Sequence, residues 1–227
     1  NGVIYFTCHE LRGTLLYFST DMGRTWRWNP DGSNYVNGTN ECSITAIPNQ
    51  APGMAALLMN CRTSVLQRRN VVWDVSRVGF SPVPRGAADY PLMVADFSPR
   101  ELIDPICQGS VVSLGNVVYH SNAASQRARE KLTVKKSMDG GWSWDAGMLI
   151  HTGASGYSQL VAWEAPRAGG QWLGVFAEVD GYLGFAKWRA AEERSSAPGP
   201  GVLAEVARGL GLAAQLLRER PSASFNA

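Results

Sequence analysis

The chain has 227 residues, which is enough for one sizeable domain with a hydrophobic core. Hydrophobic residues make up 45% and charged residues 18%, so the composition predicts a folded globular protein and excludes general disorder. The net charge of +2 is too small to indicate a nucleic acid or an anionic membrane surface as partner, and no apolar run is long enough for a transmembrane segment.

Short apolar runs, separated by Gly, Pro, Asn or Asp, follow one another up to residue 188. They are rich in Val, Leu, Tyr, Phe and Trp, as β-strands are, and helical periodicity is missing. The clearest runs cover residues 3–8, 14–19, 43–47, 54–61, 67–75, 116–121, 131–137, 159–163, 171–177 and 183–188. Together with 24 Gly, 12 Pro and 8 Trp, they predict an all-β domain of about a dozen strands over residues 1–190.

The N-terminus reads NGVIYF, without a starting Met, a basic segment or a cleavage site for a signal peptide. Because the chain starts within a predicted strand, we expect it to be a fragment or a gene model that lacks its beginning.

The composition changes after residue 190. Residues 191–201 are rich in Ser, Pro and Gly and predict a linker. In residues 202–227 the apolar positions recur at helical spacing, which predicts an amphipathic helical tail, although Gly209 and Gly211 weaken it. The tail either binds a partner or a membrane surface, or it packs on the domain; an accidental tail is the third alternative.

Four cysteines occur, at positions 8, 42, 61 and 107, and none forms a C-x-x-C pair. With only three histidines in the chain, a zinc site is not expected, and the sequence predicts neither a metal nor a cofactor. Free buried thiols are the expectation, with one disulfide left open.

The pattern Ser-x-Asp-x-Gly-x-x-Trp occurs twice. Its defined residues are Ser19, Asp21, Gly23 and Trp26 in one copy and Ser137, Asp139, Gly141 and Trp144 in the other. The pattern predicts a hairpin turn, because Asp accepts backbone hydrogen bonds two or three residues on, Gly permits a positive φ and the Trp ring fills the space under the loop. Two copies, each after a predicted strand, therefore indicate the fold and not the chemistry.

These copies resemble the Asp boxes of sialidases, and three further segments resemble motifs of that family in the same order. Residues 40–42 (NEC), with a strand ending at 57–62 (LLMNCR), are similar to the stretch in which a Glu precedes a strand ending in Asn-x-Arg. Residues 121–134, up to the second box, resemble the Ser-Asn-Pro … Arg-x-x-Leu-Thr stretch, and residues 156–160 (GYSQL) resemble Gly-Tyr-Ser-x-Leu.

The resemblance covers about residues 1–190 and is greatest to bacterial and lysosomal-type animal sialidases. It implies a partial six-bladed β-propeller: about three blades of antiparallel four-stranded sheets, the C-terminal half of a catalytic domain. The missing N-terminal half would be needed to complete the fold. The resemblance also slightly favours a lysosomal or secreted location, which the residues themselves do not specify.

The motifs imply roles for four residues. Sialic acid carries a carboxylate at its anomeric carbon, and the resemblance assigns its binding to Arg62 and Arg129, as guanidinium groups suit that anion. It assigns the nucleophile to Tyr157, since a neutral phenol avoids repulsion by this carboxylate, and the general base to Glu41. Without the motifs, Tyr157 would be a strand-end residue, Glu41 a solvated carboxylate and Arg62 half of a structural ion pair.

Several points depart from the family pattern or stay open. The family's first arginine and its acid/base Asp have no counterpart in this sequence. Ala123 replaces a common Pro, and Cys42 stands where Ser or Gln is commoner. Arg127, expected on the same side of a strand as Arg129, is its competitor, and Glu178 resembles a residue of the site rim.

The sequence thus leads to three hypotheses. The first is an exo-α-sialidase that removes terminal sialic acid from sialylated glycans with retention, with no turnover expected from this chain alone. The second is a non-catalytic sialic-acid- or glycan-binding propeller. The third is a structural Asp-box protein of the sortilin or photosystem-assembly kind, which explains the boxes but not the four site residues.

Overall fold

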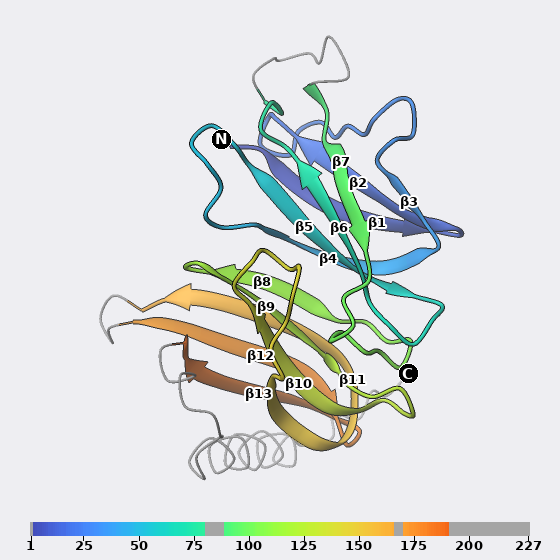
Figure 1. Cartoon of the computed structure of the whole chain (residues 1–227), viewed down its shortest axis with the longest axis vertical. Helices are drawn as coiled ribbons and strands as arrows, with labels where there is room; N and C mark the ends of the chain where they lie inside the picture. The colour runs from blue at the N-terminus through green and yellow to red at the C-terminus, as the bar shows by residue number, and fades with distance from the viewer. Residues whose placement is uncertain (1, 80–88, 166–169, 191–227) are drawn as a thin grey trace, which may run out of the picture.

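The computed structural model describes residues 2–79, 89–165 and 170–190 (Figure 1). Within these ranges the regular structure consists of thirteen strands, which confirms the all-β class. In the same part of the chain, no helix is long and apolar enough to cross a membrane. The linker predicted at 191–201 and the helical tail predicted at 202–227 lie outside the described residues, so both stay predictions.

The strands form three antiparallel sheets in which sequence neighbours pair. The first sheet holds β1 (Ile4–Glu10), β2 (Gly13–Ser19) and β3 (Tyr35–Asn37). The second holds β4 (Thr39–Ala46), β5 (Ala56–Thr63), β6 (Arg69–Asp74) and β7 (Leu92–Phe97). The third holds β8 (Ser110–Leu114), β9 (Val117–Ala123), β10 (Glu130–Ser137), β11 (Met148–Glu164), β12 (Gln171–Val179) and β13 (Tyr182–Arg189).

The six-stranded sheet changes direction within β11, which is 17 residues long. The first part of β11, up to Ala154, pairs with β10, and the part from Ser155 onward pairs with β12. The first strands of successive units also contact one another, β1 with β4, β4 with β8 and β8 with β11. Consecutive meanders whose first strands meet are the arrangement of propeller blades, so the fold is consistent with part of a β-propeller. A closed ring of six blades stays a prediction.

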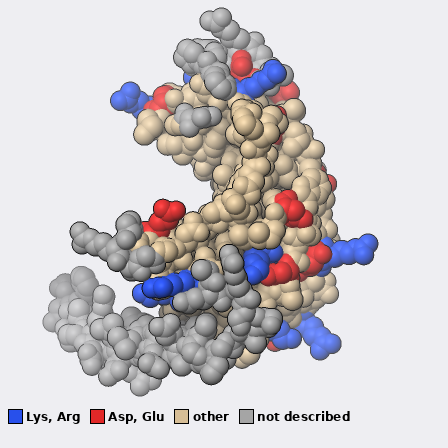
Figure 2. All heavy atoms as spheres, turned by 60° about the vertical axis from the view of Figure 1, so that its left-hand side comes forward, with Lys and Arg blue, Asp and Glu red and all other residues tan. Residues whose placement is uncertain are grey.

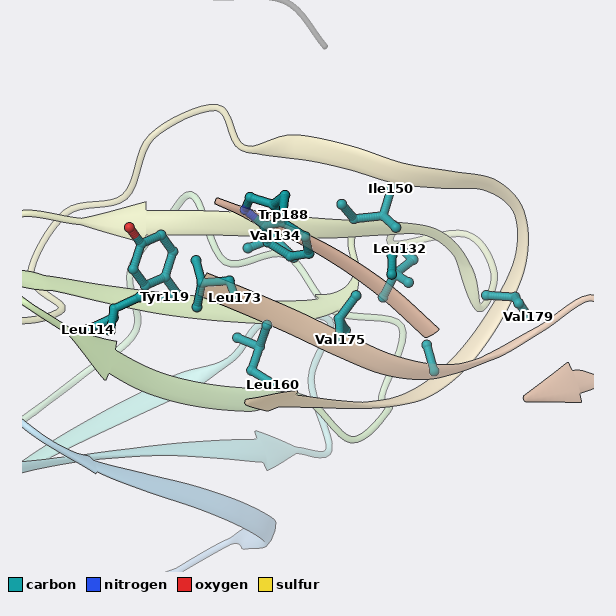
Figure 3. Packing of buried hydrophobic residues seen from close by; sticks show 12 residues of the cluster. Leu114, Tyr119, Leu132, Val134, Ile150, Leu160, Leu173, Val175, Val179 and Trp188 are labelled. Carbon is teal, nitrogen blue, oxygen red and sulfur yellow. The ribbon is translucent and has the colours of Figure 1, made fainter. Parts of the chain in front are cut away.

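Alternation of buried and exposed residues along the strands builds a core in each part of the molecule. Figure 3 shows the core of β8–β13, in which Leu132, Ile150, Leu173 and Val175 are at most 4% exposed. Burying each such side chain contributes roughly 1.5–3 kcal/mol. A smaller cluster joins the second and third sheets: Leu58 and Val72 pack with Leu102, Val111, Val118 and Trp144.

Figure 2 shows the molecule hollowed on one side. Figure 1 shows β1–β7 in the upper part of the molecule and β8–β13 in the lower part. The cluster that joins the second and third sheets therefore holds the two parts together, and residues on either side can face each other.

The two Ser-x-Asp-x-Gly-x-x-Trp turns share one hydrogen-bond pattern. In each, the Ser hydroxyl donates to the Asp carboxylate and accepts from the Gly amide, both within 2.8 Å. Gly23 and Gly141 have φ of 85° and 102°, as predicted. Asp139 accepts the amide hydrogen bond of Trp142, three residues on, as predicted, and in both turns the Asp also accepts one from four residues on, from Thr25 or Ser143.

The structure differs from the sequence predictions in two ways. Strands β3, β7 and β8 were not predicted, because each is short and lacks a clean alternation of apolar and polar residues. The expectation of free buried thiols is confirmed for Cys107, whereas Cys8 is free but exposed. It is wrong for Cys42 and Cys61, which form the one disulfide that the sequence left open.

The two tryptophans of the turns are buried to different degrees, and their contributions to stability should differ. Trp144 is 6% exposed and donates its Nε1–H to the Gly141 carbonyl, whereas Trp26 is 37% exposed. Trp144→Ala should lower the free energy of unfolding by about 3–5 kcal/mol, as for a buried aromatic, and Trp26→Ala by clearly less. Urea unfolding of both variants checks this; equal losses would contradict it.

Candidate active site

Glu41 owes its position to a bulge in β4. Asn40 pairs with Arg62 and Ser43 pairs with Asn60, so Glu41 and Cys42 together face Cys61 of β5. Glu41 has a φ of +40°, a conformation that residues other than Gly rarely adopt. A bulge of this kind redirects a side chain out of the regular alternation of the strand. It thereby brings the Glu41 carboxylate to Arg62 on the next strand.

The Glu41 carboxylate forms hydrogen bonds with two other residues of the predicted site, Arg62 and Tyr157. Arg62 Nη1 donates to Glu41 Oε2 at 2.7 Å, and the Tyr157 hydroxyl donates to Glu41 Oε1. Arg62 Nη1 also lies 3.5 Å from the Tyr157 oxygen. The three side chains come from β4, β5 and β11, and the structure therefore brings together residues that lie 95 and 116 positions apart.

Tyr157 lies where β11 passes from one pairing partner to the next. The register shifts between Ser155 and Ser158, and the Tyr157 amide donates to Glu178 Oε2 on β12 at 3.1 Å. A Cβ at position 156 would lie 2.1 Å from that same carboxylate oxygen, so Gly156 is required for the close approach. Glu178 thus fixes the backbone of the residue that carries the phenol.

Arg129 approaches the site from the loop before β10. Its Cζ lies 6.0 Å from the centre of the Tyr157 ring, and its Nη2 donates to the Ile106 carbonyl at 3.2 Å. Arg127 and Arg129 both precede Glu130, the first residue of β10, so the expectation that they share one side of a strand is wrong. Of these two arginines, only Arg129 contacts Tyr157 in the part of the chain that the structure describes.

An open hollow of about 560 Å³ adjoins this group. That volume is in the range of small-molecule sites. Glu178 lines it, as does Arg129, and the other lining residues are Ala154, Ser155, Gly156, Asp180, Gly181, Tyr182 and Leu183. The hollow therefore opens beside Tyr157, with one cationic and two anionic side chains in its wall.

Hydrogen bonding decides the charge states of the group. Partial burial disfavours the Glu41 carboxylate, but hydrogen bonds from Tyr157 and Arg62 outweigh it and lower its pKa. The hydrogen bond to Glu41, with burial, raises the pKa of Tyr157. Burial likewise opposes the charge of Arg62, yet Glu41 raises its pKa. In the resting state, Glu41 is therefore ionised and accepts hydrogen bonds from the neutral Tyr157 phenol and the Arg62 guanidinium.

A buried ion pair beneath the site escaped the sequence analysis. Arg68 and Asp104 have fully buried side chains, 3.5 Å apart, and Arg68 also donates to the Cys107 carbonyl. The Asp104 carboxylate accepts from the Cys107 amide. Together they fix the loop whose Ile106 carbonyl holds Arg129. No local pattern marks this pair, because its members lie 36 residues apart.

Among the described residues, no three His, Cys, Asp or Glu side chains gather in a way that could hold a metal ion.

Comparison with known proteins gives this geometry a context. No family model matches the sequence. A curated protein named "Sialidase" from Micromonospora viridifaciens is 27% identical over 158 residues, which cover 64% of this chain and 21% of the relative. The chain is a sialidase homologue. It spans about a fifth of the length of that relative.

Solved sialidase structures have the same fold as this sialidase homologue. The Hadza microbial sialidase Hz136 gives a TM-score of 0.59 at 22% identity, over 79% of this chain and 32% of the other. The intramolecular trans-sialidase from Ruminococcus gnavus, solved in complex with oseltamivir carboxylate, gives 0.56 at 13% identity, over 86% and 41%.

The raised pKa of Tyr157 yields a direct test of the geometry. Glu41→Ala removes the main acceptor of the phenol, so the pKa of Tyr157 should fall toward its ordinary value of about 10. Ultraviolet titration of tyrosinate, with Tyr157→Phe subtracted in each background, measures it. The control Glu101→Ala removes an exposed carboxylate elsewhere and should leave the pKa unchanged; an unchanged value in Glu41→Ala would disprove the contact.

Proposed function

We propose that this chain contributes the nucleophile, its base and two anion-binding arginines to an exo-α-sialidase. Such an enzyme, a glycoside hydrolase, removes terminal sialic acid from glycoproteins, glycolipids or oligosaccharides with retention of configuration. The observation that carries the proposal is the Glu41 carboxylate, which accepts hydrogen bonds from both Tyr157 and Arg62. Two residues that lie 21 and 116 positions from Glu41 in the chain thus contact the same carboxylate, and all three were predicted from family motifs.

The arginines supply the binding of the substrate. Within the described residues, the side-chain hydrogen bonds of Arg62 all use Nη1, and that of Arg129 uses Nη2. The other nitrogens of both guanidinium groups remain for a carboxylate of the ligand. A guanidinium binds a carboxylate in a bidentate manner that a lysine cannot reproduce. This accounts for two cations beside a site that also holds an anionic base.

The Glu41–Tyr157 hydrogen bond supplies the first chemical step. As the Tyr157 oxygen bonds to the anomeric carbon, its proton passes to Glu41 and the bond from that carbon to the leaving oxygen breaks. The ionised state of Glu41 at rest is the one that can take this proton. A water molecule then displaces the Tyr157 oxygen from the anomeric carbon, Tyr157 regains its proton from Glu41, and two inversions give net retention. Two proton transfers fall to the family's acid/base Asp, for which this sequence has no counterpart: its proton goes to the leaving oxygen in the first step, and it takes one from the attacking water in the second.

A glycan-binding propeller without turnover is the second candidate. The absence of a sequence counterpart for the family's first arginine and acid/base Asp favours it. This candidate needs Arg62 and Arg129 but gives no chemical role to the Glu41–Tyr157 hydrogen bond, so the two functions differ in their dependence on Tyr157.

Hydrolysis of a fluorogenic sialoside tests the proposal in the protein that contains this segment at its natural length. Glu41→Gln should lower kcat by about 10²- to 10⁴-fold, as expected for loss of a general base, and Tyr157→Phe by at least as much. Tyr182→Phe, a tyrosine in the wall of the same hollow, is the matched control and should keep its activity. Residues 1–227 alone should give no turnover.

The outcomes separate the two candidates. Hydrolysis that survives Tyr157→Phe would refute the assigned nucleophile. Binding of sialic acid without hydrolysis, lost in Arg62→Ala and kept in Tyr157→Phe, would establish the glycan-binding alternative instead.

A further inference from the structure

A disulfide lies directly behind two of the proposed catalytic and binding residues. Cys42 follows Glu41 in β4, Cys61 precedes Arg62 in β5, and the two cysteines are bonded across the pair of strands. Their Cα atoms are 4.0 Å apart. Each end of the disulfide is therefore one peptide unit from a residue of the site.

The disulfide spans the bulge that places Glu41. Between the pairs Asn40–Arg62 and Ser43–Asn60, two residues of β4 face only Cys61. A bulge leaves its extra residue unpaired in the ladder, and Glu41 has the left-handed φ that side chains with a Cβ disfavour. Bonding Cys42 to Cys61 prevents the bulge from moving along the strand, since a shift by one residue would separate the two sulfurs.

The two cysteines are also anchored to the interior. Cys61 is fully buried among the core residues of the first two sheets, and partly buried Cys42 packs against the same cluster. The Thr7 hydroxyl on β1 donates to the Cys42 carbonyl at 2.6 Å. The backbone on both sides of Glu41 is thus tied to two neighbouring strands, while its carboxylate extends to the site.

We propose that the Cys42–Cys61 disulfide is a positioning element for Glu41, and that a dithiol reductant switches the site off by releasing the bulge. The proposal rests on the function proposed above. In the reduction, a dithiol thiolate attacks one sulfur, the S–S bond breaks, two cysteine thiols form and the dithiol ends as its own disulfide. Once released, Glu41 can leave the left-handed conformation, and its hydrogen bonds to Tyr157 and Arg62 are lost.

The titration of Tyr157 distinguishes positioning from simple stapling. A disulfide that only stabilises the fold would change the unfolding midpoint and leave the Tyr157 phenol of the folded protein as it is. A positioning disulfide acts through Glu41, so its effect on Tyr157 must disappear when Glu41 is already absent.

The experiment uses the 227-residue chain with and without dithiothreitol, and the paired variant Cys42→Ala/Cys61→Ala as the second route to the reduced state. Mass mapping after alkylation without reductant should show the Cys42–Cys61 link. Ultraviolet titration, with Tyr157→Phe subtracted, should then show the pKa of Tyr157 lowered by reduction and by the paired variant. The shift should equal most of that caused by Glu41→Ala, and reduction should add nothing in the Glu41→Ala background.

Cys8→Ser is the matched control, because Cys8 is exposed on neighbouring β1 and lies outside the disulfide. It should behave like the unchanged protein in both redox states. The proposal would be overturned if Cys42 and Cys61 were free in the untreated protein, or if the reduced protein stayed folded with an unchanged Tyr157 titration. It would also be overturned if reduction abolished the far-ultraviolet circular dichroism of the β-structure, because the disulfide would then stabilise the whole fold.

The sialoside assay separates this proposal from the proposed function. Turnover that continues unchanged under dithiothreitol would refute positioning and leave the sialidase function standing. A redox-dependent Tyr157 titration in a protein that neither binds nor hydrolyses sialosides would support positioning of Glu41 and refute the function.

Discussion

The structure of the site depends on how one carboxylate is shared. One oxygen of Glu41 accepts a hydrogen bond from the Tyr157 phenol, and the other accepts one from the Arg62 guanidinium. The two hydrogen bonds together fix the position of the carboxylate. Because these hydrogen bonds outweigh partial burial, the carboxylate stays ionised and Tyr157 stays neutral. The base Glu41 and the acid Tyr157 are therefore hydrogen-bonded to each other while the proton stays on Tyr157. Everything that positions Glu41, from the bulge to the neighbouring strands, therefore acts on the nucleophile as well.

The fold supplies this meeting point through strand β11. One half of the strand completes the β8–β10 meander and the other half starts the β12–β13 meander, and the Tyr157 side chain reaches Glu41 and Arg62 of the second sheet from the second half. Tyr157 follows that junction by two residues, at a place where the ladder is already interrupted. Gly156 allows Glu178 to approach the backbone there. The residue in the candidate role of nucleophile thus lies where two meanders of the third sheet meet, and the packing of that sheet on the second sheet sets its distance from Glu41.

Residue patterns predicted most of the strands, and motif resemblance selected the four residues of the candidate site, but neither indicated the contacts that support those residues. Apolar runs bounded by turn residues predicted ten of the thirteen strands and missed β3, β7 and β8. Motif resemblance selected Glu41, Arg62, Arg129 and Tyr157, which do converge. It could not reveal the β4 bulge, because a single inserted residue leaves no compositional mark, or the Arg68–Asp104 pair, which forms only in three dimensions. The disulfide was equally hidden, since four cysteines without a motif allow several pairings.

The separations along the chain give the site an order of assembly. Glu41 and Arg62 lie 21 residues apart in one hairpin, whereas Tyr157 lies 116 residues from Glu41. Closing the longer loop costs about 1.5 kcal/mol more chain entropy than closing the shorter one. During synthesis from the N-terminus, Tyr157 also emerges about 5–20 s after Arg62, at typical rates of elongation. The hairpin that carries the base and one arginine is therefore fully synthesised before the phenol that completes the group.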